Sequence, residues 1–117
     1  FYDGWLRKYS AAGTALWTQT YAGAAGGDDS AAAVAVDNVN NIVLAGYQAV
    51  TGNGLDIWIQ KVSPTGSPIW STLFNGASSL DDYAFGVAVD ANDNVLAVGA
   101  ESKGGLDVDA WMGKYAP

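Results

Sequence analysis

The chain of 117 residues repeats itself at a spacing of 53 residues, and this repeat constrains the fold more than any other feature. An Asp-x-Trp motif at residues 3–5 recurs at 56–58 and at 109–111. Residues 3–55 and 56–108 align without a gap and are identical at 18 of 53 positions. Such a period is typical of proteins built from stacked supersecondary units. The single segment 1–117 therefore divides into a first repeat (3–55), a second repeat (56–108) and a partial third repeat (109–117).

Each repeat predicts four β-strands. In the second repeat, apolar runs lie at 57–62, 69–74, 85–89 and 95–100, bounded by Gly, Asn, Asp, Ser or Pro, a pattern typical of strands. Pro64 and Gly66 predict a hairpin turn between the first two runs. Asp and Asn residues at 90–94, matched by 37–41 in the first repeat, predict a second hairpin turn.

The four strands differ in a way that predicts their order. Residues 31–36 and 86–89 are mostly small, which is expected where strands crowd around one axis, so these strands are predicted to be innermost. Pro68 opens another strand and predicts an outer edge, because a strand proline is tolerated mainly at edges or first positions. The predicted fold class is all-β, with β-propeller blades of four antiparallel strands; an all-β sandwich is the alternative. The chain would be a partial propeller, with two outer strands, one whole blade and three inner strands.

The repeat also resembles a known family. The pattern D-x-W-x-x-K-[YV]-[ST]-x-x-G-x-x-[LI]-W-[ST], followed by an acidic pair and by V-A-V-D-x-x-x-N-[VI], is similar to the bacterial β-propeller repeats labelled SBBP. The resemblance covers nearly the whole chain and implies a scaffold in a secreted or cell-surface bacterial protein. These repeats are longer than the typical SBBP unit, and the extra residues, at 48–55 and 101–108, are predicted to form loops.

The composition excludes several classes of function. The chain has no His and no Cys, which excludes the usual zinc sites, thiol nucleophiles, Ser-His-Asp triads and disulfides. Twelve acidic and five basic residues give a net charge of −7, which argues against a nucleic-acid partner. No apolar run reaches the roughly 18 residues of a membrane span, so no membrane insertion is predicted. The chain is predicted not to be an enzyme and to need no cofactor, with calcium as the single candidate.

The longer connections, residues 22–30, 48–55, 75–82 and 101–108, are predicted to lie at one end of the strands, where a ligand site is expected. Two acid pairs occur there, Asp28-Asp29 and Asp81-Asp82. They are candidate ligand-binding residues, either as calcium ligands or as a pair of carboxylates for acid–base chemistry on a sugar, but the favoured interpretation is that they accept backbone N–H groups in turns. The segment 90–94 resembles a calcium loop, yet lacks the following Gly and the distant Glu, and is predicted to be a plain turn.

The aromatic residues divide into repeated and non-repeated ones. Five repeated tryptophans are predicted to pack between blades, with carbohydrate stacking as the alternative: Trp5, Trp58, Trp111, Trp17 and Trp70. Tyr47 and Tyr83 are not repeated, since Ala100 and Ser30 occupy the equivalent positions. They are therefore the better candidates for ligand binding.

The predicted partial propeller leaves apolar faces and strand edges at both ends, which either further repeats or copies of the chain must cover. Closed rings of this chain would have an even number of blades, such as six or eight. The leading hypothesis is a non-catalytic structural or protein-interaction module, with a surface protein as the possible partner. The alternative is a glycan-binding, lectin-like module. A glycoside hydrolase that uses Glu101 and Asp107 ranks last.

Overall fold

The computed structural model describes residues 1–117 and consists of nine antiparallel β-strands without a helix. The strands are β1 (Gly4–Tyr9), β2 (Ala15–Tyr21), β3 (Ser30–Val36), β4 (Ile42–Val50), β5 (Gly54–Val62), β6 (Pro68–Phe74), β7 (Tyr83–Val89), β8 (Val95–Gly104) and β9 (Asp107–Tyr115). No helix that could cross a membrane is therefore present. The all-β prediction is confirmed.

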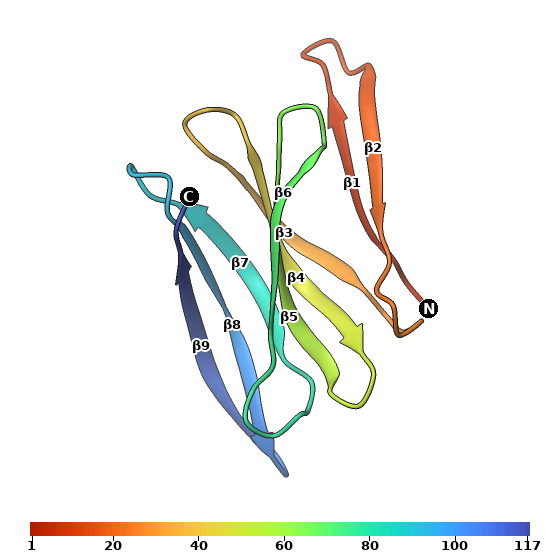
Figure 1. Cartoon of the computed structure of the whole chain (residues 1–117), viewed down its shortest axis with the longest axis vertical. Coiled ribbons are helices and arrows are strands. Elements are labelled where there is room, and N and C mark those ends of the chain that lie inside the picture. Colours follow the sequence, from red (N-terminus) through yellow and green to blue (C-terminus); the bar gives the residue numbers. More distant parts are fainter.

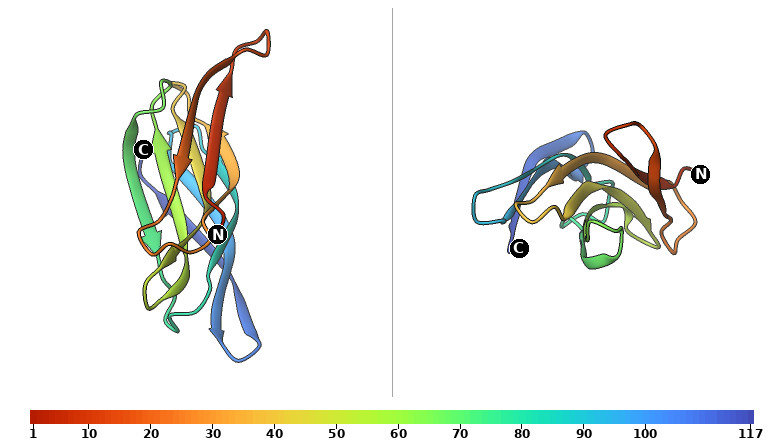
Figure 2. Two further views of the ribbon diagram at one scale, coloured as in Figure 1. Left: turned by 90° about the vertical axis from the view of Figure 1, so that its right-hand side faces the viewer. Right: turned by 90° about the horizontal axis from the view of Figure 1, so that it is seen from above.

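The strands form three separate sheets that follow one another along the chain (Figure 1). The first sheet contains β1 and β2, the central sheet has the order β3-β4-β5-β6, and the third sheet has the order β7-β8-β9. The predicted division into two, four and three strands is confirmed. Seen from above, the N- and C-termini lie on opposite sides of the molecule (Figure 2). The two-stranded and three-stranded sheets thus flank the four-stranded one.

Local sequence explains the short turns at one end of the strands. Between β5 and β6, the Gly66 N–H donates to the Ser63 carbonyl, and Gly66 has a positive φ of 89° that suits a residue without Cβ. Between β7 and β8, the Asp90 carboxylate accepts the backbone N–H groups of Asn92 and Asn94. The predicted hairpins at 63–67 and 90–94 are confirmed, and 90–94 is a turn held by its own aspartate.

The prediction of loops at 48–55 and 101–108 is wrong, because the strands continue through most of these residues. β4 and β5 remain paired as far as Val50 and Gly54, and β8 and β9 as far as Gly104 and Asp107. The turns are short because Gly54 and Gly104 take positive φ values of 84° and 108°, which only glycine adopts easily. The extra length of each repeat therefore extends a hairpin.

A glycine that recurs in each repeat lies beside an irregularity in the strand pairing. The pairing of β3 with β4 shifts register between Ala31 and Ala33, and β7 with β8 shifts at the equivalent place. A Cβ at Gly46 would lie 1.9 Å from the Ser30 carbonyl oxygen, and one at Gly99 would lie 1.9 Å from the Tyr83 carbonyl oxygen. Backbone occupies the space that a side chain would need, so the sequence repeats glycine here.

The hydrophobic core lies between the central and third sheets. Its seven buried members are Val43, Ala45, Ile57, Ile59, Ala84, Val95 and Ala97. On the central sheet these residues alternate with Leu44 and Trp58, which face the first sheet, as the two-residue period of a strand requires. The central sheet therefore buries apolar side chains on both faces, whereas each flanking sheet packs through one.

Candidate functional site

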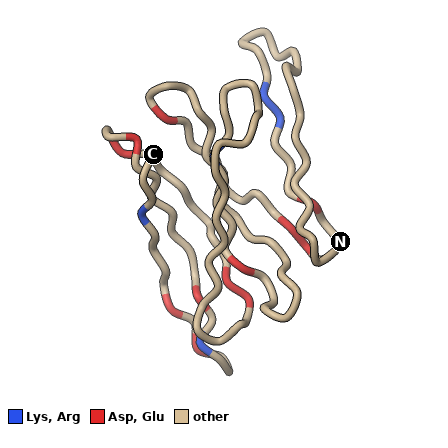
Figure 3. The backbone as a smooth tube through the Cα atoms, viewed as in Figure 1, with Lys and Arg blue, Asp and Glu red and all other residues tan.

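The longer connections meet at one end of the strands, as predicted, and hydrogen bonds join them. This end, called the loop end, contains the β2–β3 connection, the β6–β7 connection and the β4–β5 and β8–β9 hairpins (Figure 1). The Asp29 carboxylate accepts the Ala49 N–H at 2.9 Å, and the Asp82 carboxylate accepts the Ser102 N–H at 2.9 Å. Each connection is thus fastened to the hairpin beside it. Figure 3 shows acidic residues at the strand ends, including several at the loop end.

The second aspartate of each pair is a buried acceptor of backbone hydrogen bonds. Asp29 also accepts the Gly23 N–H at 2.5 Å, and Asp82 accepts the Gly76 N–H at 2.6 Å. Both side chains are almost completely removed from solvent. Since a backbone N–H that is withdrawn from water and lacks an acceptor is costly, each carboxylate stabilises its loop.

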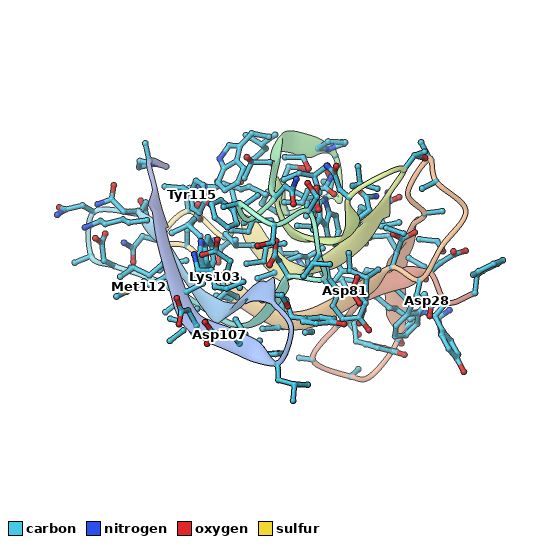
Figure 4. All side chains as sticks on the ribbon, turned by 90° about the horizontal axis from the view of Figure 1, so that it is seen from below. Asp28, Asp81, Lys103, Asp107, Met112 and Tyr115 are labelled. Atoms are coloured by element: carbon cyan, nitrogen blue, oxygen red, sulfur yellow. The ribbon has the colours of Figure 1, made fainter.

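The first aspartate of each pair has a different partner, again the same in both repeats. Asp28 accepts the Tyr2 N–H at 3.0 Å, and Asp81 accepts the Leu55 N–H at 2.9 Å. No group of three or more acidic side chains is arranged to hold a metal ion. Asp28 and Asp81 lie apart along the loop end (Figure 4). The geometry therefore favours backbone fastening for all four carboxylates.

The structure brings the two non-repeated tyrosines together. The rings of Tyr47 and Tyr83 meet edge-to-face with centroids 5.1 Å apart, and Tyr83 lies parallel to Phe85 at 6.1 Å. The Tyr83 hydroxyl donates to Asp81 Oδ2 at 3.2 Å. Burial and the nearby Asp81 charge raise the pKa of Tyr83, so it stays a neutral donor at physiological pH. Sequence reasoning missed Phe85, although it too is unrepeated, with Ala32 at its equivalent position.

The predicted role of tryptophan in packing between sheets is visible for four of the five side chains. Trp58 contacts Tyr21 of the first sheet, Trp111 contacts Phe74 and Trp70 contacts Tyr115. Trp17 Nε1 donates to the Pro64 carbonyl of the central sheet at 3.1 Å. Trp5 is instead half-exposed beneath the Arg7 guanidinium. Their aromatic partners were missed, although Tyr21 and Phe74 are 53 residues apart and could have been found from the repeat.

Glu101 has a local structural partner. Its carboxylate lies 2.9 Å from Lys103 Nζ, and Oε1 accepts the Ala77 N–H at 3.3 Å. The hydrogen bond from Lys103 lowers the pKa of Glu101, whereas a general acid for glycoside hydrolysis needs a raised pKa. Asp107 lies at the start of β9 near an exposed hairpin tip (Figure 4). This geometry gives the hydrolase hypothesis no support.

The sequence matches no family model and no curated protein. The resemblance to SBBP repeats therefore stays a prediction.

Proposed function

We propose that the three sheets are blades of a β-propeller of the SBBP type and that the segment is a non-catalytic structural or protein-interaction module. The observation that carries this proposal is a sheet-to-sheet contact that repeats with the sequence. Tyr21 meets Trp58 with ring centroids 5.1 Å apart, and 53 residues later Phe74 meets Trp111 at 5.2 Å. A contact that recurs at each step is what a row of blades around one axis needs.

The exposed faces of the flanking sheets indicate how such a module works. Trp5 and Tyr9 of the first sheet are half-exposed, although Trp58 and Val62, their equivalents in the central sheet, are buried. Solvent-exposed apolar surface of this kind favours association. Further blades, from the same polypeptide or from another copy, would cover it. From the SBBP resemblance we propose that the module belongs to a secreted or cell-surface bacterial protein.

Inserting a second copy of residues 56–108 after residue 108 tests the propeller proposal. We expect the free energy of unfolding to rise by about 2 kcal/mol or more, because one more interface buries apolar side chains worth roughly 1.5–3 kcal/mol each. Urea denaturation followed by tryptophan fluorescence measures the change. The matched control inserts a Gly/Ser linker of the same length. If the inserted repeat does not raise the free energy of unfolding above that of the unmodified chain, the sheets do not stack as repeating blades and the sandwich alternative is favoured.

Glycan binding is the second candidate function, and the cluster of Tyr47, Tyr83 and Phe85 favours it. Phe85 presents a largely exposed ring, and the Asp81 carboxylate lies against the adjacent Tyr83 hydroxyl. A sugar could stack an apolar face on the Phe85 ring, and its hydroxyl groups could donate hydrogen bonds to the Asp81 carboxylate. The cluster lies at the loop end, where a rigid scaffold usually presents its ligands.

Two substitutions that copy residues of the first repeat into the second repeat test glycan binding. Tyr83→Ser and Phe85→Ala place the residues found at 30 and 32 into the second repeat. We expect any glycan detected on an array to bind at least about tenfold more weakly to either variant, a loss of about 1.4 kcal/mol. The matched control is Tyr21→Phe, which copies Phe74 far from the cluster. Equal binding by all variants, or an array on which no glycan binds the protein, contradicts this function.

A further inference from the structure

The first and third sheets are complementary parts of one blade, an inference that rests on the proposed propeller. In the central sheet, β5 is paired on both sides, by β4 and by β6. Its equivalent in the first sheet, β1, has only the outer neighbour β2, and its equivalent in the third sheet, β9, has only the inner neighbour β8. Residues 3–9 and 109–115 share Asp, Trp, Lys and Tyr at four of seven positions. One sheet therefore lacks the inner strands that the other possesses.

A hollow marks the place of the missing inner strands. It has a volume of about 390 Å³ and lies between β1 and β3, lined by Leu6, Arg7, Lys8, Tyr9, Val34, Val36, Asn40 and Ile42. Val34 and Val36 are each 57% exposed there. Their equivalents on β7, Val87 and Val89, pack against the core of the central sheet. The same surface is thus covered at one interface of the chain and open at the other.

The third sheet carries the apolar face that would fill this hollow. Val98 on β8 is 48% exposed and Met112 on β9 is 70% exposed. Their equivalents in the central sheet, Ala45 and Ile59, are fully buried against the third sheet. Met112 projects from the side of β9 that faces away from the central sheet (Figure 4). The interface inside the chain is therefore a template for a second interface between chains.

We propose that the third sheet of a second copy occupies the hollow beside the first sheet, with β9 of that copy replacing β1 against β2. The result is a composite blade with the order β7-β8-β9 from one copy and β2 from the next. β9 is the strand that stays because it has nine paired positions with β8 across a tight turn, whereas β1 has six with β2. Each copy then supplies one whole and one composite blade, so a ring of six or eight blades needs three or four copies.

Because the chain contains no cysteine, a disulfide between two introduced cysteines reports the strand exchange directly. Leu6 pairs with Gln19 in the first sheet, and the equivalent of Leu6 on β9 is Met112. In the composite blade, position 112 of one copy lies opposite position 19 of the next, with Cβ atoms about 4.5–5.5 Å apart. The test variant is therefore Gln19→Cys/Met112→Cys. The matched control is Thr20→Cys/Met112→Cys, since position 20 points to the opposite face of the strand.

We expect the test pair, oxidised at micromolar protein concentration, to link at least ten times more chains than the control pair on a non-reducing gel. Native mass spectrometry of the unmodified chain is expected to give discrete trimers or tetramers. Met112→Glu, which alters an exposed side chain of the single chain, is expected to abolish the oligomer while leaving the circular dichroism spectrum intact. This variant keeps the test decisive if the cysteine variants fail to fold.

Three results would overturn strand exchange. If the chain stays monomeric, a second copy is not the partner. If both cysteine pairs link the chains equally, the copies associate without the β9–β2 register. An oligomer that persists in Met112→Glu places the contact elsewhere. None of these results affects the propeller proposal, which the insertion of an extra repeat tests separately.

Discussion

Replacing Lys61 with methionine is expected to lower the free energy of unfolding by about 3–5 kcal/mol, because it leaves the Asp37 carboxylate buried without its cation. Lys61 Nζ lies 2.7 Å from Asp37 Oδ2, and both side chains are almost fully buried. Asn41 donates two further hydrogen bonds to the same carboxylate, from its backbone and its side chain. Chemical denaturation of the two proteins at neutral pH measures the loss.

The third sheet supplies the matched control. Lys114 and Asp90 form the equivalent ion pair 53 residues later, at 3.1 Å, but this pair is open to solvent, with the lysine side chain 58% exposed. Lys114→Met is therefore expected to change stability far less than Lys61→Met, since water solvates the carboxylate that is left behind. Equal losses in the two variants would show that burial does not set the strength of this repeated pair.

The same pair predicts how stability depends on pH. Burial alone would raise the pKa of Asp37, but hydrogen bonds from Lys61 and Asn41 outweigh it and lower the pKa to about 2. Because the folded-state pKa lies below the unfolded value, the contribution of Asp37 to stability is complete above about pH 4 and is lost as the pH falls through about 2. In Lys61→Met the pKa of Asp37 rises, so part of this loss moves to higher pH.

The features that sequence predicted well are those set by short-range physics. Alternating apolar runs, Pro64 with Gly66, and the Asp and Asn residues at 90–94 act within a few residues of one another, so the strands and turns could be located without the fold. The repeat then supplied the division into two, four and three strands. The hairpins at 48–55 and 101–108 were missed because their register depends on pairing across the sheet, while their many polar and glycine residues look like loops.

The candidate site depended on packing between sheets, which sequence alone does not give. Sequence identified Tyr47 and Tyr83 as unusual, because they break the repeat. Their contact exists only because β7 of the third sheet packs beside β3 and β4 of the central sheet. Asp29 and Asp82 show the opposite case. Their role could be predicted from the general tendency of aspartate to accept backbone N–H groups, although not the distant donors Ala49 and Ser102.

Replacing Trp58 with alanine is expected to cost about 3–5 kcal/mol of stability, the range for removing a fully buried aromatic side chain. Trp58 is 4% exposed, its ring contacts Tyr21, and its Nε1 donates to Ser71 Oγ at 3.0 Å. The truncation leaves a cavity between the first and central sheets, whereas the exposed Ser71 hydroxyl is left to hydrogen-bond with water. The midpoint of urea unfolding measures the effect.

Trp5 and Trp111 occupy the same repeat position as Trp58, so the same substitution at these positions tests the packing between sheets. Trp5 is 52% exposed, so Trp5→Ala is expected to cost less than about 1 kcal/mol, close to an ordinary surface change. Trp111 is partly buried against Phe74, so Trp111→Ala is expected to fall between the other two. Identical side chains at identical strand positions then differ mainly in how much of the neighbouring sheet covers them. If the three losses are equal, the intrinsic preference of tryptophan for the strand, and not packing between sheets, determines its place in the repeat.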